Sequence, residues 1–146
     1  PDIERDRKSF VQLTEPTALR AMRLRYVNRV VMGGNPEGPA NLDKFPRLGP
    51  RSPDPGRLQF NGFVHQYALV DLDSGAEAIV VLASEPAAGL GSEPAFVLDV
   101  TASIALTTEP SDWSAISTQV TVLHELKNRI FERTLTDECL RSNRNA

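Results

Sequence analysis

One pair of neighbouring residues whose types could do chemistry is a histidine followed by a glutamate. His124 and Glu125 begin like the metal-binding helix of a zinc protease, in which a second histidine follows four positions after the first. That position holds Asn128, so the second ligand is missing. We therefore interpret His124 as a structural histidine on a helix, and we expect no metal site and no cofactor.

A second histidine could take part in acid–base catalysis. His65 would form an acid–base pair with Asp71 or Asp99 if neighbouring strands brought the side chains together. We favour the alternative, a half-exposed strand histidine beside aromatic rings. The single cysteine, Cys139, has no histidine near it in the sequence, so a catalytic thiol is not expected. No catalytic residue is assigned, and the chain is interpreted as non-catalytic rather than as an enzyme.

A stripe of arginines offers a different kind of chemistry, the binding of anions. In the stretch RAMRLRYVNRVVM at 20–32, read as a strand, Arg23, Arg25 and Arg29 fall on one side. The other side carries Met22, Leu24, Tyr26, Asn28, Val30 and Met32. The stripe is either a binding surface or one half of an internal charge match. Asn28, placed among apolar residues, is expected to satisfy its amide structurally, and a ligand contact is the alternative.

The elements that must position these residues are four strands and a helix. Alternation predicts strands at 20–32, 58–73, 76–83 and 95–106, with a hairpin turn at Gly75 between the second and third. An apolar stripe from Trp113 onward predicts a long helix with its N-cap at Ser111, and Thr136 begins a short terminal helix.

These elements predict an α+β fold, an antiparallel sheet of about four strands with a long C-terminal helix packed on one face. We expect residues 1–146 to form a single domain, with a long Gly/Pro-rich loop at 33–57. The uncovered face of the sheet is predicted to gather the polar side chains. They are Arg23, Arg25, Arg29, Phe63, His65, Tyr67, Asp71, Asp99, Thr101 and Ser103.

Charge is distributed unevenly along the chain. Residues 1–60 hold 11 Lys or Arg against 7 Asp or Glu, whereas residues 61–126 hold 9 Asp or Glu and no Lys or Arg. Cross-strand pairing would bring the two signs together, and each exposed pair contributes about 0–1 kcal/mol. We therefore expect the arginine stripe to be neutralised within the fold.

Three sequence blocks carry a resemblance to a known group. They are LRYVNRV in the first strand, FVLDV in the fourth, and LHELKNRIFERTLTDECL at the end. The matching positions are Leu24, Arg25, Tyr26, Asn28, Arg29, Leu98, Asp99, Leu123, His124, Asn128, Phe131, Glu132, Thr136 and Asp137. In these blocks the chain resembles a sporadically distributed family of uncharacterised prokaryotic proteins. The resemblance implies no activity, but it implies a longer protein of which this chain is the C-terminal portion.

The predicted function is a non-catalytic interaction or ligand-binding module that uses the open sheet face or the long loop. Its partner would be another protein, the missing N-terminal half of its own chain, or a second copy in a homodimer. A nucleic-acid-binding module is the first alternative, with Arg23, Arg25 and Arg29 beside Phe63 and Tyr67 as a stacking surface. Nucleic acid ranks second because the acidic middle segment would repel phosphates. A hydrolase or nuclease with an unrecognised site is the other alternative.

The setting expected from the sequence is the cytoplasm. No apolar run is long enough to span a bilayer, so no membrane association is predicted. The lone cysteine excludes an internal disulfide, which suits a reducing compartment.

Overall fold

A computed structural model describes residues 3–31, 62–85 and 95–142, so the expected loop at 33–57 lies outside the described residues. Within these ranges the elements are α1 (Ile3–Thr14), β1 (Leu19–Val31), β2 (Val64–Val70), β3 (Glu77–Ser84), β4 (Ala95–Thr108), α2 (Trp113–Thr134) and α3 (Asp137–Ser142). The four expected strands are confirmed. Three of them begin and end within two residues of the prediction. β2 does not include 62–63 or 71–73 of the predicted strand 58–73, and residues 58–61 lie outside the described residues.

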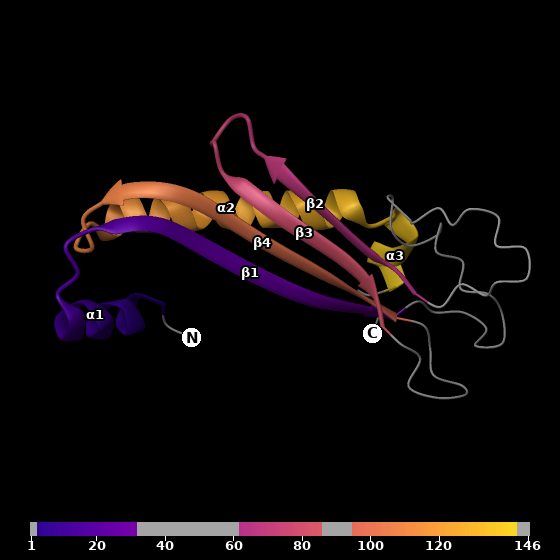
Figure 1. The fold of residues 1–146 in the computed structure, drawn as a ribbon, viewed down its shortest axis with the longest axis horizontal. Helices are drawn as coiled ribbons and strands as arrows, with labels where there is room; N and C mark the ends of the chain where they lie inside the picture. Colours follow the sequence, from indigo (N-terminus) through magenta and orange to yellow (C-terminus); the bar gives the residue numbers. More distant parts are fainter. Residues whose placement is uncertain (1–2, 32–61, 86–94, 143–146) are drawn as a thin grey trace, which may run out of the picture.

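The strands form one antiparallel sheet in the order β1-β4-β3-β2. The expected hairpin joins β2 to β3, where Gly75 adopts a φ of 69°, and the Asp71 N–H donates to the Ala76 carbonyl at 2.8 Å. A positive φ strains most residues but not glycine, which explains the turn at this position. Figure 1 shows the sheet with α2 behind one face, which confirms the predicted α+β architecture.

Helix α2 begins one residue later than the sequence indicated. The cap is Asp112 rather than Ser111: the Asp112 carboxylate accepts a hydrogen bond from the Ala115 backbone N–H at 2.9 Å. The cap satisfies one of the backbone donors that a helix leaves free in its first turn. From this start the helix lies mainly over β4 and β1. The β2 border of the same sheet face is left beside the helix rather than under it.

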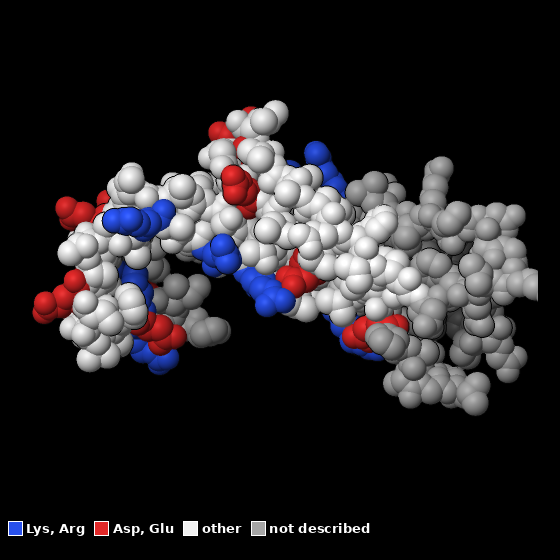
Figure 2. All heavy atoms as spheres, in the orientation of Figure 1, with Lys and Arg blue, Asp and Glu red and all other residues white. Residues whose placement is uncertain are grey.

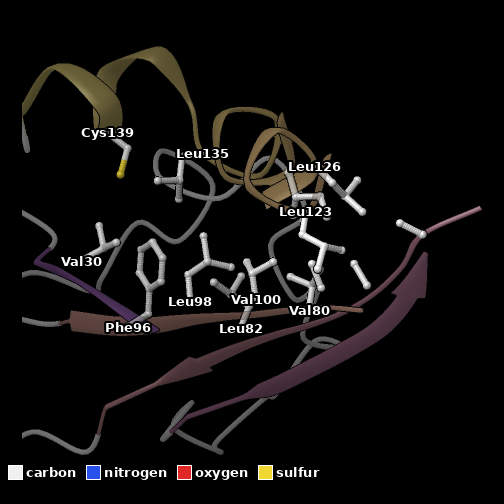
Figure 3. Packing of buried hydrophobic residues seen from close by; sticks show 14 residues of the cluster. Val30, Val80, Leu82, Phe96, Leu98, Val100, Leu123, Leu126, Leu135 and Cys139 are labelled. Carbon is white, nitrogen blue, oxygen red and sulfur yellow. The ribbon is translucent and has the colours of Figure 1, made fainter. Parts of the chain in front are cut away.

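The core lies between α2, the α3 region and the central strands. Phe96, Leu98 and Val100 of β4 are fully buried, and Leu123 of α2 packs against them. Figure 3 shows Leu135 and Cys139 closing the same cluster from the C-terminal segment. Cys139 is fully buried in this cluster.

Helix α1 was not predicted, because its sequence IERDRKSFVQLT is dominated by charge. Its Arg7 contacts the start of α2. The Arg7 guanidinium donates to the Pro110 carbonyl and lies 4.9 Å from the centroid of the Trp113 ring. A cation over an indole face is favourable, so this contact links α1 to the helical layer.

Candidate functional site

The open face is the side of the sheet away from α2. Antiparallel register places its side chains in four rows that run from β1 through β4 and β3 to β2. The rows are Arg29–Val97–Ala83–Val64, Val27–Asp99–Val81–Gln66, Arg25–Thr101–Ile79–Ala68 and Arg23–Ser103–Glu77–Val70. The expected arginine stripe is therefore confirmed on this face, and it lies along one border of the sheet.

Two arginines of the stripe are held by carboxylates. Arg25 reaches diagonally to Asp99 on β4, with its Nη2 2.6 Å from a carboxylate oxygen and its Nε 3.1 Å from both oxygens. Arg29 donates through Nε to Glu85 at 2.7 Å. The hydrogen bonds to Asp99 and its negative charge raise the pKa of Arg25. The predicted cross-strand charge match is thus confirmed for Arg25, whereas the partner of Arg29, Glu85, follows the end of β3 and is not on a neighbouring strand.

Arg23 differs from the other two arginines. Among the described residues it forms no ion pair, and it lies in one row with Ser103 and Glu77. Arg23 and Glu77 both line a shallow hollow of about 490 Å³. The hollow therefore has a cation on one side and a carboxylate on the other, an arrangement that suits no strongly anionic ligand.

The open face also carries exposed apolar side chains. Val27, Val64, Val70 and Ile79 are 59%, 70%, 60% and 47% exposed, and we call these four residues the apolar patch. Figure 2 shows this face: blue and red atoms follow β1, whereas the area over β3 and β2 is largely white. The side chains on a solvent-exposed face of a sheet are normally polar, so exposed aliphatic side chains on three strands are unusual.

The aromatic residues expected beside the arginines lie on the other face. Phe63, His65 and Tyr67 point toward the helix side, where Tyr67 is opposite Val80 and packs against the core. The prediction for this strand was wrong because both of its alternating sets contain apolar residues, so the pattern could not show which set is buried. Phe63 and His65 instead contact each other, with ring centroids 6.1 Å apart in an edge-to-face arrangement.

The proposed acid–base pairs of His65 are not assembled. Asp99 lies on the opposite face of the sheet, bound to Arg25. Asp71 accepts hydrogen bonds from the Ser74 hydroxyl at 2.5 Å and from Arg129 at 2.7 Å. These contacts, the Ser74 hydroxyl first, hold the pKa of Asp71 below its ordinary value, which keeps the carboxylate charged.

The remaining candidate residues lie between β1 and α2. The His124 Nδ1 is 3.2 Å from the Tyr26 hydroxyl, and the Lys127 Nζ lies 4.0 Å from the centroid of the same ring. His124 therefore joins the helix to β1, as a structural histidine would. Asn28 is half-buried on this helix side opposite Leu98, in a stretch of regular pairing.

A groove runs between β2 and α2 because the helix does not cover this border of the sheet. Its volume is about 600 Å³, and its apolar walls come from Tyr67, Leu69 and Leu72 on one side and Leu126 and Ile130 on the other. Sequence reasoning missed the groove, because it depends on where the helix axis crosses the sheet.

No group of three or more His, Cys, Asp or Glu side chains that could hold a metal ion occurs within residues 3–31, 62–85 and 95–142. In the same ranges no helix combines the length and apolarity needed to cross a membrane. Comparisons of the chain with protein-family models, curated proteins and solved structures found no match. The family resemblance of the three sequence blocks therefore stays a prediction.

Proposed function

We propose that the chain is a non-catalytic protein-interaction module whose binding surface is the open face of its sheet. The observation that carries the proposal is the apolar patch, in which Val27, Val64, Val70 and Ile79 are about half or more exposed. Burying aliphatic side chains of this kind contributes about 25 cal/mol per Å² of apolar area removed from water. A protein partner that covers the patch would gain this contribution.

The ion pairs beside the patch give the surface the composition of a protein interface. Arg25 with Asp99 and Arg29 with Glu85 form a polar border along β1 on either side of Val27, and the other three residues of the apolar patch lie on β3 and β2. An apolar centre with a charged rim is typical of protein–protein contacts. Rim charges set orientation and association rate more than affinity, so the apolar residues are expected to dominate binding.

Nucleic acid is the weaker partner on physical grounds. Phosphate binding needs free cations, but Arg25 and Arg29 are already engaged by carboxylates. Base stacking needs aromatic rings on the same surface, but Phe63 and Tyr67 lie on the other face.

The test is affinity capture with the full chain and two variants that each place a glutamate on an exposed apolar position. Ile79→Glu changes the centre of the open face, and Leu13→Glu makes the same kind of change on α1, where the side chain is 84% exposed. Proteins retained by the wild type and by Leu13→Glu should be lost with Ile79→Glu. For a partner found in this way, calorimetry should show at least about a tenfold weaker Kd with Ile79→Glu, equivalent to about 1.4 kcal/mol.

Two outcomes would refute the proposal. One is an identical set of captured proteins for the two variants after circular dichroism has shown both to be folded. The other is loss of all captured material on nuclease treatment, together with loss of binding in Arg23→Glu.

A further inference from the structure

The two borders of the sheet differ in their protection against strand addition. β1 carries four arginines, Arg20, Arg23, Arg25 and Arg29, whereas β2 has the sequence VHQYALV with no charged residue. Charged side chains on an edge strand discourage pairing with another strand, and their absence leaves a template for it. Among the described residues nothing pairs with the outer side of β2, which forms one border of the sheet (Figure 1).

The backbone groups of β2 that face outward can be assigned from the hairpin. Ser84 N–H donates to the Phe63 carbonyl at 3.0 Å at one end, and Asp71 N–H donates to the Ala76 carbonyl at 2.8 Å at the other. Antiparallel strands alternate between residues that bond inward and residues that do not. Odd-numbered residues therefore bond to β3, and the outward N–H and C=O groups belong to Val64, Gln66, Ala68 and Val70.

These four residues are self-complementary about a two-fold axis at Tyr67. In that register Val64 lies opposite Val70 of the partner subunit, and Gln66 lies opposite Ala68 of the partner subunit. All four outward residues then form hydrogen-bonded pairs, each exchanging two bonds. A register shifted by two residues leaves at least one of the four unpaired.

The side chains suit the same register. Val64 and Val70, which are 70% and 60% exposed, would cover each other on the open face. On the helix side Tyr67 would meet its own copy, and no charged residue of β2 would face another. Because α2 lies over β4 and β1, the space beside β2 is not occupied by the helix.

We propose that a second copy of this chain pairs its β2 with this edge in antiparallel fashion, joining two four-stranded sheets into one sheet of eight strands. The dimer contact shares Val64 and Val70 with the apolar patch of the proposed function, but it depends on the backbone edge of β2, which Ile79→Glu on β3 leaves unchanged. The occupant is a second copy because the edge matches itself in backbone pattern, side-chain size and absence of charge.

The test is sedimentation velocity of the full chain over a range of concentrations, with two pairs of matched variants. Ala68→Pro removes an outward N–H while sparing the bonds to β3, and Ala68→Thr keeps that N–H. The wild type and Ala68→Thr should form dimers, and Ala68→Pro should raise the dimer Kd at least about tenfold, because it loses two hydrogen bonds across the axis.

The second pair tests the register without altering the backbone. Val64→Lys combined with Val70→Lys places like charges opposite each other twice, whereas Val64→Lys combined with Val70→Glu places opposite charges there. The first double variant should be monomeric, and the second should still form dimers. A wild-type chain that stays monomeric at every concentration would overturn the proposal, as would dimers that persist in both Ala68→Pro and the two-lysine variant.

Discussion

Truncating Leu123 to alanine tests whether α2 seals the core as the structure indicates. The side chain is fully buried between the helix and the central strands. Leu123→Ala removes three carbon atoms, at about 0.8 kcal/mol for each buried CH₂, which gives about 2.4 kcal/mol for transfer alone. The cavity left behind adds to this, so the free energy of unfolding should fall by about 3–4 kcal/mol. Leu72→Ala removes the same atoms from a side chain that is 94% exposed and should change it by less than about 0.5 kcal/mol.

Urea unfolding followed by far-ultraviolet circular dichroism measures both variants. With a urea dependence of about 1–3 kcal/mol per molar, the midpoint of Leu123→Ala should lie about 1–4 M below that of the wild type. The reasoning fails if Leu123→Ala loses less than about 1 kcal/mol. Such a result would mean that the helix is not held on the sheet at this position, and that the apolar helix side of the sheet is covered in another way.

Two further predictions concern local interactions. Asp112→Ala should lower the free energy of unfolding by about 0.5–2 kcal/mol, because Ala115 loses its capping carboxylate, whereas Ser111→Ala should leave it nearly unchanged; equal losses in urea unfolding would show that Asp112 is not the cap. Asp71, whose pKa is lowered first by the Ser74 hydroxyl, should stabilise the fold fully above its unfolded value of about 3.9, and this contribution should be lost as pH falls through the lower folded value. Asp71→Asn should therefore be less stable than the wild type at neutral pH, and the difference should shrink below about pH 4; a difference that grows with acidity would contradict the assigned direction.

The strands and α2 could be predicted because in each of them apolar residues recur at a regular spacing on one side. In β4, Phe96, Leu98 and Val100 alternate with less buried residues, and the structure buries them fully. In β2 the same rule did not identify the buried side, since Val64 and Val70 on one side of the strand are as apolar as the residues on its other side. Only the pairing of Tyr67 with Val80 decides which set faces the helix. α1 was missed because its sequence is dominated by charge, and the contact with Trp113 comes from a cation, Arg7.

The charge match of the open face could be predicted only in outline. Opposite signs on neighbouring strands indicated pairing, and Arg25 with Asp99 bears this out. The diagonal geometry follows from a register that no sequence pattern fixes, because Asp99 lies directly opposite Val27. The partner of Arg29, Glu85, follows the end of β3 and lies outside the predicted strands. The groove beside β2 had no sequence signal, because it arises from the placement of α2 over β4 and β1.

The asymmetry between the two borders of the sheet determines what strand addition can build. In the proposed dimer the two β2 strands pair with each other at the two-fold axis, and β1 forms both outer borders of the sheet. Each β1 carries its arginines along the exposed border, and Arg25 and Arg29 remain bound to carboxylates of their own subunit. A further dimer would have to place its β1 arginines beside these, at the cost of like-charge repulsion. An association through β2 therefore closes at two copies instead of continuing into a fibre, because a symmetric contact uses the same patch on both subunits. Replacing the β1 arginines with neutral residues would remove the repulsion that prevents further association, whereas the β2 contact itself would be unchanged.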